Sequence, residues 1–169
     1  MLLNKDMESV MKVIDVVFIL LLKILSDPSE EVVSLDLEVL AIISSTEQNF
    51  VKFLRNLVNM LRTDQKLLTK AGFIIRQLSV MLDPEKIYVE LSKILQSYDT
   101  NLEFCSVMIQ TLNMILLTSK ELLELRELIK KGSSNAKSAE LFQQLYRSWS
   151  HNPVATLSLC LLAKNYKHA

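Results

Sequence analysis

Apolar residues recur at helical spacing along most of the chain and are interrupted by short polar breaks. Four of these breaks contain a residue that can cap a new helix, namely Asp27, Asp64, Asp99 and Asn135, at intervals of 37, 35 and 36 residues. The side chain of such a residue accepts hydrogen bonds from the free N–H groups at a helix start. A two-helix repeat of this length is typical of α-solenoids. The pattern therefore predicts an all-α, HEAT- or armadillo-like α-solenoid of antiparallel helix pairs.

The polar breaks divide the chain into about nine expected helices, which pair in order into four repeats with a ninth helix left over. Together they form a single α-solenoid segment over residues 1–169. Only two glycines and three prolines occur, which favours helices over strands. The expected helices cover residues 9–26, 27–43, 47–61, 64–82 and 83–96, a sixth from 99 or 100, 118–132, 138–150 and a ninth from 153.

Three local signals within these helices carry specific predictions. Asp27 is expected to cap the second helix, with Pro28 as its first residue. Thr118 is expected to open the seventh through a capping box with Glu121. Gly72 falls inside the fourth expected helix, where glycine costs about 1 kcal/mol relative to alanine. Either a close approach of another helix or a local kink would explain it.

The two ends of the expected solenoid are unusually apolar. Lys12, Asp15 and Lys23 are the only charged residues between positions 10 and 25, and eight of the ten residues 154–163 are apolar. The terminal repeats of a solenoid need polar outer faces. We therefore expect the chain to be a piece of a longer solenoid, with further helices packed on both ends.

The charge balance and the cysteines narrow the classes of function. The 19 basic and 19 acidic residues cancel, so the chain has no net charge to attract nucleic acid. Cys105 and Cys160 lie far apart in apolar segments, which predicts buried thiols in a reducing compartment. The apolar run of residues 16–22 is too short to cross a membrane, and no targeting segment is recognisable. These features indicate a cytoplasmic protein.

The sequence contains no recognisable catalytic, cofactor or metal motif. His151 and His168 are the only histidines, and neither has Cys, Asp or His at a metal-ligand spacing. The two glycines cannot form a phosphate-binding loop, and a Gly-x-Ser-x-Gly motif does not occur. We therefore expect a protein that is not an enzyme and that carries no cofactor or metal.

Aromatic and polar side chains are densest at the expected corner between the eighth and ninth helices. Tyrosine, tryptophan and arginine dominate the binding hot spots of protein interfaces. The alternative is that the tryptophan fills the corner between the two helices. The candidate partner-binding residues are Tyr146, Arg147, Trp149, His151 and Asn152.

Basic residues of the second expected repeat form a second candidate surface. If they cluster, they bind an acidic partner or anionic lipid headgroups. If they are dispersed, they are ordinary solubilising charges. These residues are Lys52, Arg55, Arg62, Lys66, Lys70 and Arg76.

Three segments of the chain carry a family resemblance. They read Phe-Ile-Ile-Arg-Gln-Leu at 73–78, Gln-Thr-Leu-Asn at 110–113 followed by Ile-Leu-Leu-Thr-Ser at 115–119, and Leu-Tyr-Arg-Ser-Trp-Ser-His-Asn-Pro-Val-Ala-Thr at 145–156. With these segments, residues 21–169 resemble the C-terminal region of the ArPIKfyve family, the vacuole-morphology HEAT-repeat scaffolds.

The resemblance implies a non-catalytic scaffold. Members of this family hold the PIKfyve lipid kinase and a Sac-domain phosphoinositide 5-phosphatase in one assembly. That assembly makes and removes phosphatidylinositol 3,5-bisphosphate on endosomal and vacuolar membranes. The C-terminal region of the family is associated with self-assembly and with phosphatase binding. The resemblance therefore implies both enzymes as partners, self-association of the full-length protein and a peripheral location on these membranes.

An alternative function follows from the basic residues of the second repeat. In that case the chain is a peripheral membrane-binding solenoid, which contacts anionic lipid directly through those side chains.

Overall fold

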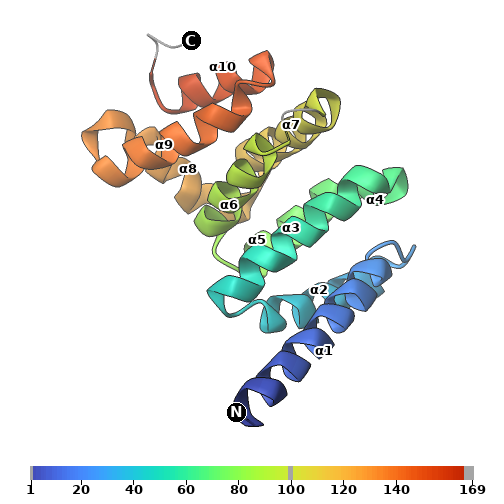
Figure 1. Ribbon diagram of the computed structural model, residues 1–169. Helices are drawn as coiled ribbons and strands as arrows, with labels where there is room; N and C mark the ends of the chain where they lie inside the picture. Colours follow the sequence, from blue (N-terminus) through green and yellow to red (C-terminus); the bar gives the residue numbers. More distant parts are fainter. Residues whose placement is uncertain (1, 99–100, 166–169) are drawn as a thin grey trace. The chain divides into compact units, whose positions relative to one another are not determined.

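The computed structural model describes residues 2–98 and 101–165 (Figure 1). Over this part of the chain it contains ten α-helices, two short 3-10 helices and no strand, so the expected all-α helical solenoid class is confirmed. The α-helices are α1 (Leu2–Ile24), α2 (Glu30–Ile43), α3 (Glu47–Thr63), α4 (Gln65–Thr69), α5 (Ala71–Met81), α6 (Pro84–Gln96), α7 (Leu102–Thr118), α8 (Leu123–Lys130), α9 (Ala136–Trp149) and α10 (Pro153–Leu162). The 3-10 helices are η1 (Lys120–Leu122) and η2 (Gly132–Ser134).

Polar side chains cap the helices at several of the expected starts. Asp64, Asp83 and Asn135 each accept, through Oδ1, a hydrogen bond at 2.9 Å from the backbone N–H two residues further on. These contacts cap α4, α6 and α9, so the three expected starts are confirmed. The expected start at Asp99 lies outside the described residues. The described start of α7 is capped by Asn101, whose side chain accepts a backbone hydrogen bond at 3.2 Å.

Two of the expected caps are wrong. Ser29, not Asp27, is the N-cap of α2, because Asp27 Oδ1 accepts the N–H of Ser29 at 2.8 Å and stabilises the turn before the helix. Pro28 therefore precedes α2 instead of opening it. Thr118 is the last residue of α7 and donates its hydroxyl to Met114 O at 2.7 Å, so it does not form the expected capping box.

The expected helix over residues 64–82 is two helices, because the chain breaks at Lys70 between α4 and α5. Lys70 has φ −92° and ψ −3°, away from regular helical values. Gly72 lies just after the break, and a Cβ built on it would be 3.8 Å from Thr111 Cγ2, an ordinary van der Waals contact. The feature next to Gly72 is therefore a local kink, and no close helix approach requires a glycine there.

The chain forms two compact units, Met1–Leu67 and Leu68–Ala169. In the first unit, α1 packs against α2 and α3. The rings of Phe18 on α1 and Phe53 on α3 are fully buried and stack with their centroids 6.2 Å apart. Buried aromatic rings remove a large apolar area from water, so this stack is a main contact of the first core.

In the second unit, α7 packs against both α5 and α10, and α9 packs most extensively against α6. Tyr88 on α6 is fully buried and donates its hydroxyl to Leu112 O of α7 at 2.9 Å. Burial raises the pKa of Tyr88. Arg126 on α8 donates to Leu116 O at 2.8 Å and to Ser119 O at 2.6 Å. This cation satisfies carbonyl groups at the C-terminal end of α7 and holds α8 against it.

Asp36 on α2 is a buried acid without a compensating partner. It is 4% exposed, and neither of its carboxyl oxygens has a hydrogen-bond partner among the described residues. Burial disfavours the charged form and raises the pKa of Asp36 from 3.8 to about 6. The folded state therefore binds a proton at this carboxyl more tightly than the unfolded state does.

We expect the Asp36 carboxyl to make the protein less stable as pH rises from about 4 to about 6, because the folded state holds the extra proton only below its raised pKa. The variant Asp36→Asn removes this loss. It should be more stable than the parent at pH 7.5 by about 1–3 kcal/mol, since one pKa unit corresponds to about 1.4 kcal/mol. Urea unfolding at pH 7.5 and pH 5 measures both effects. Glu38→Gln, an exposed change on the same helix, is the control, and an equal gain there would contradict the prediction.

The two glycines should respond in opposite ways to substitution by alanine. Gly72 has helical backbone and room for a Cβ, so Gly72→Ala should leave stability unchanged or raise it by up to about 1 kcal/mol. Gly132 has φ +54°, and a Cβ there would lie 2.9 Å from the backbone oxygen of Ala163. Gly132→Ala should therefore lower the unfolding free energy by more than about 1 kcal/mol. Thermal unfolding of both variants, compared with the parent, decides whether this order holds.

Candidate partner-binding surface

The five candidate residues of the sequence motif all lie at the corner between α9 and α10. Trp149 is fully buried, so it packs inside this corner. Arg147 is exposed, whereas Tyr146 and His151 are half-buried. The ring of Tyr146 stacks on Phe142 of the same helix, with a centroid distance of 5.5 Å. Of the five, Arg147 is the residue whose side chain is most open to a partner.

Hydrogen bonds from Asn152 connect this corner to α7. Asn152 is the N-cap of α10, and its Oδ1 accepts from Ala155 N at 3.0 Å. Its Nδ2 donates to Ser106 Oγ on α7 at 3.0 Å. The hydroxyl of Thr156 donates back to Trp149 O at 2.6 Å. These bonds fix the start of α10 against both α7 and the end of α9.

The imidazole of His151 is also used within the corner. Its Nδ1 lies 2.7 Å from Ser148 O. Because a carbonyl oxygen can only accept, Nδ1 carries the proton and donates it. The indole Nε1 of Trp149 has no partner in the described part of the chain, so Trp149 contributes through packing. His151, Trp149 and Asn152 therefore position α10, as the structural alternative for this motif predicts.

The outer face of α10 carries a row of exposed apolar side chains. Val154 is 74% exposed, Leu157 is 45% exposed and Leu161 is 50% exposed. Their spacing of three and four residues places them on one side of the helix. The opposite side is buried through Ala155, Leu159 and Cys160. We call Val154, Leu157 and Leu161 the α10 face. α10 contains no charged residue, so an apolar surface is presented directly to solvent.

A second hollow lies beside the C-terminal end of α10. It measures about 270 Å³ and combines the aromatic ring of Phe142 with polar groups from the segment that follows α10. The lining residues are Gly132, Ser133, Ala139, Phe142, Gln143, Ala163, Lys164 and Asn165. The end of α10 thus lies next to a surface depression that can accept a side chain of a partner.

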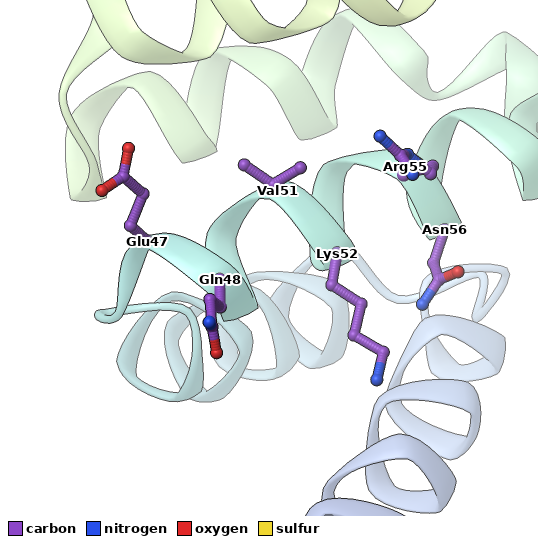
Figure 2. A pocket seen from close by; sticks show the side chains of 6 residues that line it. All are labelled: Glu47, Gln48, Val51, Lys52, Arg55 and Asn56. Atoms are coloured by element: carbon purple, nitrogen blue, oxygen red, sulfur yellow. The ribbon is translucent and has the colours of Figure 1, made fainter.

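The basic residues of the second expected repeat are only partly brought together. A groove of about 470 Å³ runs along α3 and includes Lys52 and Arg55 (Figure 2). Lys52 forms an ion pair with Asp15 on α1, which neutralises much of its charge. Arg62 lies further along α3 and donates to Asn59 Oδ1 at 3.0 Å. The groove is lined by Glu47, Gln48, Val51, Lys52, Arg55 and Asn56, so the other basic candidates are outside it.

The described residues contain no group of three or more His, Cys, Asp or Glu side chains that could hold a metal ion. Cys105 and Cys160 are both buried, as predicted, and burial raises the pKa of the Cys160 thiol. In the same part of the chain, no single helix meets the length and hydropathy needed to cross a membrane. One bent pair, Leu102–Thr118 with Lys120–Lys130, meets them jointly but turns by 84°. The site geometry therefore consists of helix faces and shallow hollows.

Comparison with known proteins identifies relatives of this chain. Residues 64–169 match the family model that describes the partner-binding C-terminal region of vacuolar protein 14. The chain is 48% identical over 169 residues to the VAC14 homolog of Arabidopsis thaliana, covering 99% of this chain and 23% of that protein. It is 44% identical over 158 residues to the VAC14 homolog of Schizosaccharomyces pombe, covering 92% of this chain and 19% of that protein.

A third relative is the vacuole morphology and inheritance protein 14 of Saccharomyces cerevisiae. It is 35% identical over 169 residues, covering 98% of this chain and 19% of that protein. The chain thus spans about a fifth to a quarter of the length of the curated relatives that it matches. No solved structure matches it significantly. The region matched by the family model begins close to the start of the second compact unit, Leu68–Ala169.

The Asn152 contacts predict a larger stability loss than an ordinary helix cap does. Asn152→Ala removes the α10 cap and the bond to Ser106, which should cost about 2 kcal/mol. Asn135→Ala removes only the α9 cap and should cost about 1 kcal/mol. Urea unfolding measures both, and Ser106→Ala completes a double-mutant cycle with Asn152→Ala. Equal losses for the two asparagine variants, or additive behaviour in the cycle, would show that the bond between α7 and α10 does not contribute.

Proposed function

The chain belongs to the Vac14 family, and from this membership we propose that it is a non-catalytic scaffold module. Membership confirms the resemblance found in its sequence. In this proposal the module helps to hold a PIKfyve-type phosphoinositide 5-kinase and a Sac-domain 5-phosphatase in one assembly. The observation that carries it is the match of residues 64–169 to the family model of a partner-binding region. We take the partner named in that model to be the Sac-domain phosphatase.

The proposed mechanism is proximity. Binding two enzymes to one scaffold raises the effective concentration of each near the other and near their shared lipid. A kinase and a phosphatase held together can control phosphatidylinositol 3,5-bisphosphate in both directions on endosomal and vacuolar membranes. The printed name of the S. cerevisiae relative refers to vacuole morphology, which supports this location. Self-association of the full-length protein and a peripheral attachment to the membrane belong to the same proposal.

The corner between α9 and α10 has two roles in this proposal. Arg147 is exposed and can meet an acceptor on the partner directly, as arginine hot spots do. Tyr146 and His151 offer their half-exposed edges beside it. Trp149 and Asn152 act through the position of α10, because the first is buried and the second is engaged with α7.

A second candidate function is direct binding of anionic lipid. The observation in its favour is the groove on α3 that contains Lys52 and Arg55. The ion pair between Lys52 and Asp15 weakens the positive potential of that groove. The scaffold is therefore the first proposal. Flotation with phosphoinositide-containing vesicles tests the alternative, which is removed if binding does not depend on anionic lipid.

We expect the purified chain to recover a Sac-domain phosphatase from cell lysate, read by mass spectrometry, and to bind the purified phosphatase directly. Arg147→Ala should weaken that binding about tenfold, a loss of about 1.4 kcal/mol. Its unfolding midpoint should not change, because the side chain is exposed. Arg76→Ala, an exposed arginine change on α5, is the matched control. A folded chain that binds neither the phosphatase nor the kinase would contradict the scaffold proposal.

A further inference from the structure

We propose that the α10 face, formed by Val154, Leu157 and Leu161, is the surface on which the Sac-domain phosphatase docks. This inference rests on the proposed scaffold function and deepens it by naming the contact surface. It differs from the sequence motif at residues 146–152, which lies beside this face and positions it. The occupant is a folded protein that presents an uncharged, apolar patch to α10.

The chemistry of the α10 face favours a protein interface. Three large apolar side chains are 45% to 74% exposed on one side of a helix that has no charged residue. The central part of protein interfaces is depleted of charged residues and enriched in apolar contacts. A partner that covers these side chains removes their apolar area from water, and no charge on α10 has to be desolvated at the same time.

The corner holds this face in place before any partner arrives. Asn152 connects the start of α10 to Ser106 on α7, and Thr156 connects it to the last residue of α9. Buried Leu159 and Cys160 pack the inner side of the helix. Binding to a surface that is already ordered avoids most of the entropy cost of arranging it.

Other exposed apolar side chains in residues 64–169 are less suited to this role. Val80 on α5 and Leu123 on α8 are the single exposed large apolar residues of their helices in the described chain. On α7, the polar residues Glu103 and Gln110 interrupt the exposed side. The α10 face is thus the one uninterrupted apolar row in the described part of the region that the family model matches.

A lipid surface fits the α10 face less well than a protein does. Helices that lie in a membrane interface carry Lys or Arg on the side opposite their apolar face. α10 has neither residue, and its opposite side is buried against the second unit. The face therefore lacks the cations that would anchor it to anionic headgroups.

The test uses the full chain and the purified Sac-domain phosphatase. Val154→Glu is expected to fold, because residue 154 is exposed and an acid in the first turn of a helix is favourable. We expect Val154→Glu to weaken phosphatase binding at least tenfold, and Leu157→Glu/Leu161→Glu to weaken it at least thirtyfold. Leu157→Met should bind normally, since it keeps the apolar character. Val80→Glu, on α5, is the control for adding a carboxylate to an exposed valine of the same unit.

The outcomes separate the two proposals. If the parent chain does not bind the phosphatase, the proposed function fails. If the parent binds and the folded α10 variants bind equally well, the docking surface is wrong while the function stands. Light scattering and vesicle flotation are run on the same samples. Loss of self-association or of vesicle binding by Val154→Glu, with phosphatase binding intact, assigns the face to a second copy or to lipid and overturns the proposal.

Discussion

The constraint on which this structure depends is that every helix must bury one apolar side against a neighbouring helix. A single amphipathic helix of this length is marginal in water, so its stability comes from packing. In the first unit the requirement is met by the Phe18–Phe53 stack between α1 and α3. In the second unit α7 contributes most, because it packs against both α5 and α10. Helix faces that find no neighbour remain apolar and exposed, and the α10 face is one of them.

Polar side chains determine how the packed helices are oriented. Tyr88 joins α6 to α7 through its buried hydroxyl, and Arg126 joins α8 to the end of α7. Asn152 does the same for α10, since one end of its amide caps the helix and the other end bonds to Ser106. Each of these groups satisfies a backbone or side-chain atom of a different helix, so apolar packing alone does not decide the angles between helices.

Much of this fold could be predicted from the sequence, because helix starts are local. The caps at Asp64, Asp83 and Asn135 depend only on a side chain and the next two residues. The break at Lys70 was not predicted, because no proline or polar cluster marks it. The burial of Trp149 was left open, since the same side chain suits a hot spot and a helix corner. The exposed side of α10 requires knowledge of which helices pack on it, and a nearly uniform apolar sequence does not contain that information.

The way in which the polar groups are used favours a binding role over chemistry. The histidine, asparagine and arginine side chains of the second unit that hold helices in place are already engaged. His151 donates to Ser148 O, and Arg126 donates to the end of α7. What such a module can offer to other molecules is its surface, and there affinity comes from a few well-placed side chains on a rigid frame. A scaffold needs no more than this, because the reactions belong to the enzymes that it brings together. The rigid corners are therefore consistent with a module whose function is to hold one surface in a fixed position.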